Sequence, residues 1–231
     1  MYRYETHLHT AEVSDCASAL GAEQAKRYKE LGYDGIIVTD HFYNGNCRPE
    51  IRSESDYAKK VELFCRGYEN AKAEGDRIGI KVFFGWEYSY DGADLLTYGL
   101  DKQWLLDNPD VCGISVYEYC MRVHHDGGYI IHAHPFREAG YLREIHLLPQ
   151  WVDAVEVFNS GNRGDNARAM DARARWYAEQ YDFPMTAGTD NHHLSAELIS
   201  GIMTEEPLTT VQDYARAVAD RRVKLILPDQ Y

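Results

Sequence analysis

Short apolar runs alternate with longer amphipathic stretches along nearly the whole chain, and no other feature of the sequence constrains its fold as strongly. Each apolar run is brief and is bounded by residues that favour turns, as the buried strands of a parallel sheet tend to be. Strand–helix alternation of this kind predicts an α/β protein with a mostly parallel sheet. We expect β-strands at Tyr2–Thr6, Gly35–Thr39, Lys81–Trp86, Asp94–Gly99, Gly128–Ile131, Ala154–Phe158, Pro184–Ala187 and Lys224–Leu227.

The stretches between these runs carry the periodicity of helices. In Glu54–Glu74, apolar side chains recur at helical spacing on one face. Asn166–Tyr181 is rich in Ala and Arg and contains no helix-breaking residue. Ser115–Glu118 and Thr209–Gln212 have the sequence of capping boxes, which predicts that a helix begins at each.

Polar residues gather where the predicted strands end, and this distribution favours a closed barrel over an open sheet. A β/α barrel builds its active site from the ends of many strands, whereas an open sheet uses one switch point and leaves most strand ends unused. The sequence therefore predicts one barrel domain that spans residues 1–231. The residues that end or follow a predicted strand are His7, His9, Asp40, His41, Glu87, His132, His134, Glu156, Asp190 and His192.

Charge and cysteine content limit the partners and the environment of the chain. Its formal net charge of −13 argues against a protein that grips nucleic acid through Lys and Arg, although a basic patch or bound metal can reverse the sign locally. Five cysteines without a Cys-x-x-Cys pair indicate a reduced chain with no disulfide framework. The first residues contain no apolar signal region, and no apolar run approaches membrane-spanning length. We expect a cytoplasmic protein that does not bind membranes, and the sequence does not indicate its oligomeric state.

The pair His7 and His9 begins a candidate metal site. Two histidines at i and i+2 of a strand project to the same face, so both rings can reach one ion. Alone, this pattern is weak, because surface or core histidines produce it too. Further strand ends add carboxylate and imidazole groups, and burying such groups together is costly unless something positive lies among them. The joint pattern therefore predicts a metal centre.

The mix of candidate ligands narrows the metal. Imidazole with carboxylate, and without thiolate, suits zinc, manganese or iron. The ligands are too many for one tetrahedral zinc, so at least two ions and a bridging carboxylate are expected. Such a pair lowers the pKa of a shared water and holds a phosphoryl group as it is displaced.

The motifs in their order resemble those of the PHP (polymerase and histidinol phosphatase) family from residue 7 to about residue 193. They are His7-x-His9-Thr10, Thr39-Asp40-His41, Gly85-x-Glu87, His134-Pro135 and Asp190-x-His192. The resemblance implies a distorted (β/α)7 barrel, a cluster of two or three divalent ions and phosphoesterase chemistry. It also implies the ligands: His7, His9, Glu87 and Asp190 for a first ion, Glu87 and His134 for a second, and His41 and His192 for a third.

The chain departs from the fuller family pattern at two places. Where many members have a ligand shortly after the first motif, this chain offers Asp15, which is either a ligand or the cap of a following helix. Where many have a histidine after the glutamate, it offers Asp94. His132 is either a further ligand or a partner of a ligand. These alternatives leave the count of ions at two or three.

Three residues are candidates for catalysis besides the ligands. Arg137 follows a strand end, where its guanidinium suits a phosphate, although a surface salt bridge would explain it equally well. His193 is either a proton donor to the leaving group or a bystander, and Asp40 lies beside His41 at a strand end.

Other polar residues are given supporting or structural roles. Glu156, and less strongly Asn159, are interpreted as hydrogen-bond partners of a ligand histidine. Cys16 and Cys47 lie near the first two motifs, but no base partner marks either as a nucleophile. Three further histidines lie in predicted helices away from strand ends and are assigned structural or surface roles: His124, His125 and His146.

The sequence thus predicts a phosphoesterase in which a metal-bound hydroxide attacks phosphorus. A small-molecule phosphate ester is favoured over nucleic acid because of the acidic charge. Two alternatives are an amidohydrolase-like enzyme that cleaves C–N bonds, which shares the first histidine pair and the late Asp, and a non-catalytic module in which metal only stabilises the fold. Metal content and turnover of a phosphate monoester discriminate among the three.

Overall fold

A computed structural model describes residues 1–162, 164–194 and 199–228 of the chain. Within these residues the strands are β1 (Tyr2–Glu5), β2 (Gly35–Val38), β3 (Lys81–Tyr90), β4 (Ala93–Tyr98), β5 (Tyr129–Ala133), β6 (Ala154–Asn159), β7 (Met185–Gly188), β8 (Gly201–Thr204) and β9 (Lys224–Ile226). The helices are α1 (Gly21–Glu30), α2 (Pro49–Arg52), α3 (Tyr57–Ile78), α4 (Lys102–Asp107), α5 (Val116–His125), α6 (Ala167–Gln180) and α7 (Val211–Ala219). All eight predicted strands are present, and β8 and the short helices α2 and α4 are additional elements.

The strands form one sheet in the order β7-β6-β5-β4-β3-β2-β1-β8-β9, so the first seven follow one another in chain order. The sheet is less parallel than predicted, since β4 runs against both β3 and β5. The cause is a two-residue hairpin turn at Asp91 and Gly92, whose φ angles of 41° and 95° are both positive. Asp-Gly is a preferred sequence for such a turn, because its twist matches that of the two strands.

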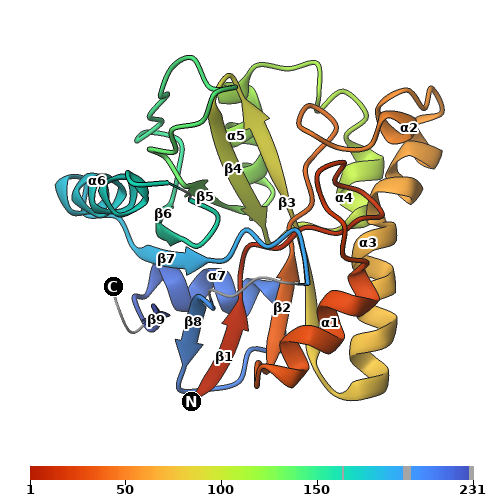
Figure 1. Cartoon of the computed structure of the whole chain (residues 1–231). Coiled ribbons are helices and arrows are strands. Elements are labelled where there is room, and N and C mark those ends of the chain that lie inside the picture. Colours follow the sequence, from red (N-terminus) through yellow and green to blue (C-terminus); the bar gives the residue numbers. More distant parts are fainter. Residues whose placement is uncertain (163, 195–198, 229–231) are drawn as a thin grey trace.

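The sheet curls into a nearly closed barrel, and the seam lies beyond the ends of β1 and β7. There the amide of Asp190 donates to the carbonyl of His7 (2.9 Å), and the amide of His9 donates to the carbonyl of Asn191 (3.0 Å). The antiparallel hairpin of β8 and β9 lies beside β1, outside this seam (Figure 1). The predicted distorted seven-stranded barrel is therefore confirmed, with Lys224–Ile226 as an edge strand.

Local capping explains where the main helices begin and end. The side chain of Asp56 caps α3 by accepting from the amide of Lys59 (3.1 Å), and the helix ends at Gly79 in a left-handed conformation. Ser115 caps α5 as predicted. The cap of α7 is Thr210, which pairs with Asp213, so the predicted capping box at Thr209–Gln212 was wrong by one residue.

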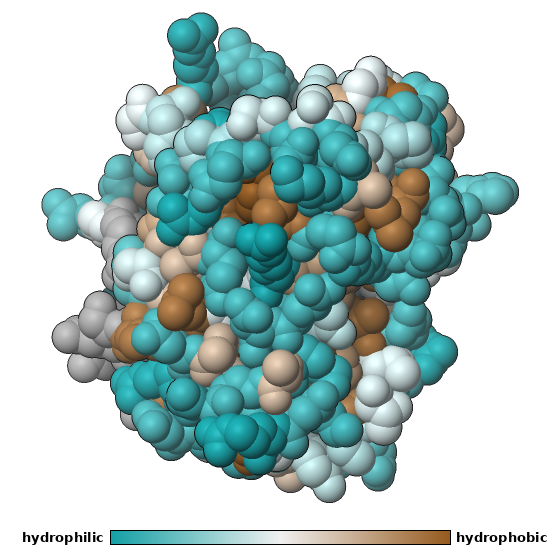
Figure 2. Space-filling model, turned by 90° about the vertical axis from the view of Figure 1, so that its right-hand side faces the viewer, coloured by the Kyte–Doolittle hydropathy of each residue, from teal (hydrophilic) through white to brown (hydrophobic). Residues whose placement is uncertain are grey.

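The interior consists of aromatic and aliphatic side chains on both sides of the sheet. Trp86 of β3 is fully buried and its indole nitrogen donates to the hydroxyl of Tyr119 in α5 (2.7 Å). The outer face over α1 and α3 is mostly hydrophilic, with hydrophobic atoms in small separate patches (Figure 2). Among the described residues, no helix is both long and apolar enough to cross a membrane.

Candidate metal centre

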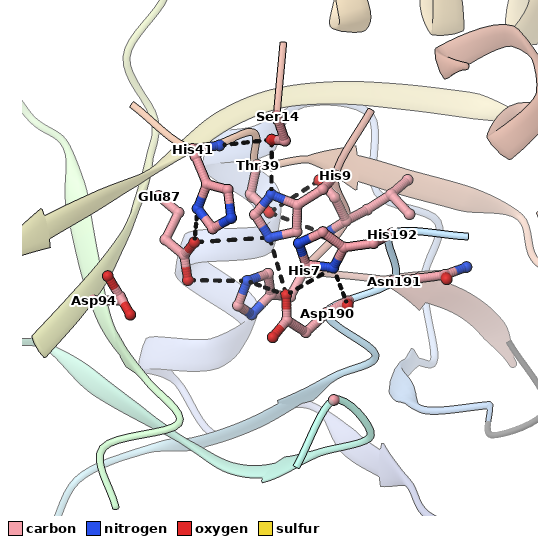
Figure 3. Close-up of polar contacts among 12 residues, drawn as sticks. His7, His9, Ser14, Thr39, His41, Glu87, Asp94, Asp190, Asn191 and His192 are labelled. Atoms are coloured by element: carbon pink, nitrogen blue, oxygen red, sulfur yellow. Dashed lines mark hydrogen bonds and ion pairs between the residues drawn. The ribbon is translucent and has the colours of Figure 1, made fainter. Parts of the chain in front are cut away.

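The ends of the barrel strands open into a cavity of about 1150 Å³. Six groups from four strand ends point toward one another at its floor (Figure 3). His7 and His9 follow β1, His41 follows β2, Glu87 lies within β3, and Asp190 and His192 follow β7. The buried apolar strands place these residues, because each strand fixes the point at which its following polar side chain emerges.

The first group of atoms lies around His7 and His9. Nε2 of His7 lies 3.2 Å from Oε1 of Glu87 and 3.4 Å from Oδ1 of Asp190. Nε2 of His9 lies 3.0 Å from the same Asp190 oxygen and 3.7 Å from Oε2 of Glu87. Ligands held at about 2.0–2.2 Å from one tetrahedral ion lie roughly 3.3–3.6 Å apart. The observed separations, from 3.0 to 3.7 Å, are centred near this range, so these atoms lie about as far apart as ligands of one ion.

A second group shares Glu87. Nε2 of His134 lies 3.2 Å from Oε1 of Glu87 and 4.0 Å from Oδ2 of Asp94, so Asp94 joins this part of the site. The backbones of His134 (φ 28°) and Asp190 (φ 54°) are left-handed. Residues other than glycine persist in that region only where their surroundings enforce it, as at functional sites.

A third group consists of His9, His41 and His192, whose ligand atoms lie within 4.8 Å of one another. The rings of His41 and His192 each lie 4.2 Å from that of His9. Sγ of Cys16 lies 3.3 Å from Nε2 of His41. Asp15 is not brought into this group: its side chain is 44% exposed and lies 3.9 Å from Arg48.

Several atoms at the centre of the site are buried without a hydrogen bond. Among the described residues these include Nε2 of His7, Nε2 of His9, Nδ1 of His41 and Oε2 of Glu87. Nδ1 of His41 and Oε2 of Glu87 form an ion-pair contact of 2.6 Å, but their geometry is not that of a hydrogen bond. Leaving buried polar atoms unpaired is costly, and divalent cations bound at this cluster would offset that cost. The donor set of imidazoles and carboxylates fits such an ion.

Outer contacts orient the ligand rings. Nδ1 of His7 lies 3.0 Å from Oε1 of Glu156, so Glu156 contacts a candidate ligand histidine. Nδ1 of His9 lies 3.2 Å from Oγ of Ser14, and Nδ1 of His192 lies 2.8 Å from the carbonyl of Asp190. In each ring the contact at Nδ1 leaves Nε2 directed to the site, as in histidines that bind metals.

The carboxylates of the site are held ionised by their neighbours. Burial alone would raise the pKa of Glu87, but His41 and His7 bring it well below its usual value. Burial would likewise raise the pKa of Asp190, but Arg137 and His7 bring it well below. His9 differs, since burial and the neighbouring His192 and His41 lower its pKa. Burial would lower the pKa of His7 and of His41, but Glu156 raises that of His7 and Glu87 that of His41, each well above its usual value. Histidine binds metal ions in its neutral form, so metal binding at this site would release protons.

Arg137 and His193 line the cavity, whereas Asp40 lies behind it. Nη2 of Arg137 lies 2.7 Å from Oδ2 of Asp190 and donates to Oδ1 of Asn159 (2.8 Å). Nδ1 of His193 lies 2.7 Å from Oγ of Ser18. Asp40 is buried and accepts from the amide and hydroxyl of Thr10 and from the hydroxyl of Ser14.

Glu5 and Ser14 take part in the site, although neither is among the residues predicted from the sequence. The carboxylate of Glu5 accepts from the amides of His7 (2.9 Å) and Thr189 (2.9 Å) and from the hydroxyl of Thr189 (2.6 Å). It thus ties the two strand ends at the barrel seam, and burial raises its pKa to about 7. For Glu5, the signal in the sequence is a charged residue inside the predicted first strand, Tyr2–Thr6.

The remaining histidines lie apart from the centre. The ring of His132 packs edge-on against Tyr177 of α6 (5.9 Å), and none of the candidate ligand groups in the described residues includes it. His124 pairs with Asp153, and His125 is exposed. His146 lies in a loop near Asp91, so its predicted place in a helix was wrong, although its position away from the centre was predicted.

No family model matches the chain. An uncharacterized protein of Methanocaldococcus jannaschii is 34% identical over 90 residues, a match that covers 35% of this chain and 36% of that protein. The chain therefore spans only about a third of this relative.

Three solved structures resemble the whole chain. A two-domain protein from Bacteroides vulgatus, described as containing a predicted PHP-like metal-dependent phosphoesterase, has a TM-score of 0.70 at 14% identity over 98% of this chain and 64% of its own. A lesion-specific endonuclease from Pyrococcus furiosus has a TM-score of 0.60 at 12% identity over 98% of this chain and 58% of its own. An amidohydrolase from Chromobacterium violaceum, with sulfate and no metal, has a TM-score of 0.53 at 12% identity over 96% and 97%. These likenesses establish the fold: the chain has the barrel that these three structures share.

Proposed function

We propose that this protein is a metal-dependent phosphoesterase that hydrolyses a small-molecule phosphate ester. The observation that carries the proposal is the convergence of buried imidazole and carboxylate atoms that lack hydrogen bonds at the floor of a cavity. Such a set fits two or three divalent ions, which we expect to be zinc, manganese or iron. When bound, these ions lower the pKa of a coordinated water and stabilise charge on phosphoryl oxygens.

The proposed ligands follow the three groups of atoms. His7, His9, Glu87 and Asp190 hold the first ion, and Glu87, Asp94 and His134 hold the second. His41 and His192 hold the third. Glu87 lies between these groups, with Oε1 near His7 and His134 and Oε2 near His41, which supports a bridging role.

The remaining residues position groups and move protons. Arg137 holds Asp190 in place through its 2.7 Å ion pair, and its guanidinium at the cavity wall binds a phosphate oxygen of the substrate. His193, held by Ser18, donates a proton from Nε2 to the leaving oxygen. Asp40 acts on the site through Ser14, whose hydroxyl lies against His9.

A small substrate is favoured by the charge of the cavity. Among its lining residues in the described part of the chain, Arg137 is the only Lys or Arg. One guanidinium suits one phosphate group, whereas a nucleic-acid groove requires several cationic contacts along the backbone. The formal net charge of −13 adds to this argument.

A substrate panel tests the proposal. Protein loaded with zinc, manganese or iron is assayed with phosphorylated sugars, nucleotides and amino alcohols, a generic phosphodiester, DNA and a cyclic amide. We expect metal-dependent release of phosphate from a small monoester or diester. Cleavage of DNA alone would replace the substrate class, and cleavage of the amide alone would favour C–N hydrolysis. A full metal complement with no turnover would favour a non-catalytic module.

A further inference from the structure

The sequence offers Asp15 as a ligand at the third group of histidines. In the structure, the side chain that lies there is that of the next residue, Cys16. Asp15 turns outward to Arg48, and Cys16 turns inward, with Sγ 3.3 Å from Nε2 of His41. Cys16 also interacts with the ring of His192 and lines the cavity beside both histidines. The thiol is thus the group that faces both rings from the loop between β1 and α1.

The loop that carries Cys16 is held by hydrogen bonds on both sides of this residue, and these contacts fix the position of the thiol. The amide of Asp15 donates to the carbonyl of Asn46 (2.9 Å), and the amide of Ser18 donates to the carbonyl of His192 (2.9 Å). Ser14 forms an isolated antiparallel bridge with Cys47. Cys16 lies between these anchors.

Both histidines present a nitrogen to this thiol. Nδ1 of His192 is engaged by the carbonyl of Asp190 (2.8 Å), which leaves Nε2 as its metal-binding atom. Nδ1 of His41 lies against Glu87 (Figure 3), and its Nε2 faces Cys16. Nε2 of His9, which is wholly buried and has no hydrogen-bond partner, is directed into the same group. Three imidazoles whose ligand atoms lie within 4.8 Å of one another are evidence, independent of the thiol, that this group is built for a cation.

We propose that Cys16 is a thiolate ligand of the third metal ion, together with His41 and His192, and that this position selects zinc. Zinc binds imidazole nitrogen at about 2.0–2.1 Å and thiolate at about 2.3 Å, so two such atoms on one tetrahedral ion lie roughly 3.5 Å apart. The observed separation of 3.3 Å is close to that value. Binding breaks the S–H bond, forms an S–Zn bond and releases one proton to solvent.

The thiolate gives this position a different metal preference from the rest of the centre. Soft sulfur ligands favour zinc, whereas manganese prefers carboxylate and water. The first two groups, with imidazoles and carboxylates only, accept either metal. Two histidines and one cysteine would supply three protein ligands, the number found in catalytic zinc sites. The inference rests on the proposed metal centre, but it makes a claim about coordination that does not depend on which substrate is cleaved.

Cobalt substitution tests this coordination directly. The full chain is stripped of metal and titrated with Co²⁺, and its near-ultraviolet absorption is recorded for the natural protein, Cys16→Ser and Cys112→Ser. Cys112 is a matched control because it is also exposed but lies outside the cavity lining. We expect a sulfur-to-cobalt charge-transfer band in the natural protein and in Cys112→Ser, and its loss in Cys16→Ser. Equal bands in all three proteins, or none in any, would overturn the proposal.

Two further measurements cover a variant that folds poorly and separate this claim from the phosphoesterase proposal. In the natural protein, zinc should protect Cys16, but not Cys112, from alkylation by iodoacetamide; alkylation of Cys16 at an unchanged rate in saturating zinc would refute ligation. In Cys16→Ser, zinc binding at one site should weaken by about 100-fold, the upper end of the loss on removing even an outer partner of a metal ligand. A sulfur–cobalt band without turnover of a phosphate ester would support Cys16 as a ligand and refute the proposed phosphoesterase activity. Turnover without the band would support that activity and refute Cys16 as a ligand.

Discussion

Replacing Glu156 with glutamine tests whether outer contacts set the protonation of the ligand histidines. Oε2 of Glu156 accepts from the amide of His134 (3.0 Å) and from Nδ2 of Asn159 (2.8 Å), and Oε1 faces Nδ1 of His7 (3.0 Å). A carboxylate can accept all three hydrogen bonds. In Glu156→Gln the amide oxygen can serve the two donors, but its NH₂ group then faces Nδ1 of His7.

The consequence is a change of tautomer at His7. Nδ1 must then accept a hydrogen bond, so the proton moves to Nε2, the atom that lies 3.2 Å from Glu87 in the candidate centre. Hydrogen bonds to a charged group are worth about 1.5–3 kcal/mol, which corresponds to roughly 10- to 150-fold in affinity. Losses of about 10- to 100-fold are typical when the outer partner of a metal ligand is removed.

The assay is zinc affinity by competition with a chromophoric chelator, with thermal unfolding to verify that the variant folds. Glu138→Gln is the matched control, because Glu138 pairs with Arg173 at the surface and does not touch the centre. We expect weaker zinc binding in Glu156→Gln and unchanged binding in Glu138→Gln. A folded Glu156→Gln protein with the zinc affinity of the natural protein would refute the reasoning.

Three further predictions concern packing, metal removal and Arg137. A Cβ at Gly67 would lie 2.0 Å from Oγ1 of Thr10 and 2.7 Å from Oδ2 of Asp40, so Gly67→Ala should lower the free energy of unfolding by about 1–3 kcal/mol. Gly140 has open space around it, so the control Gly140→Ala should have the denaturation midpoint of the natural protein. Equal midpoints for both variants would contradict this prediction. Removing metal with a chelator should lower the melting temperature by roughly 5–10 °C, since a ligand at 100 times its Kd stabilises by about 2.7 kcal/mol, and an unchanged melting curve would argue against a resident ion. Arg137→Lys keeps the charge, but a lysine cannot contact Asp190, Asn159 and Asn162 at once. The kcat/KM for a phosphate ester should therefore fall by about 10-fold or more. Unchanged kinetics would exclude Arg137 from the site.

The sequence predicted the floor of the site because short apolar strands fix where the next polar side chain emerges. His7, His9, Glu87 and Asp190 converge as expected, since the ends of the barrel strands share one rim. The antiparallel β4 was not foreseen, although the Asp91-Gly92 turn was a readable signal for a hairpin. The alternation of strands and helices favours repeated parallel units, and the hairpin at Asp91-Gly92 is the exception to that pattern.

Other parts of the site depend on contacts between distant segments, which a single sequence does not reveal. Whether Asp15 or Cys16 faces the histidines is decided by a loop that is held by Asn46 and His192, far away in sequence. The roles of Glu5 and Ser14 likewise depend on Thr189 and Asp40, which approach them only in the folded barrel. One-residue shifts of this kind reverse the direction of a side chain without changing any local pattern.

Metal-dependent phosphate release by the natural protein and by Asp190→Asn is the most direct test of the central claim. Oδ1 of Asp190 lies within 3.4 Å of both His7 and His9, so the variant removes a charged ligand at the heart of the centre. Asp76→Asn, an exposed position paired with Lys72 on α3, is the control. The account predicts that the natural protein and Asp76→Asn release phosphate from a small ester only when metal is present, and that Asp190→Asn loses both an ion and this activity. Full activity in Asp190→Asn, or phosphate release that persists after complete metal removal, would contradict it.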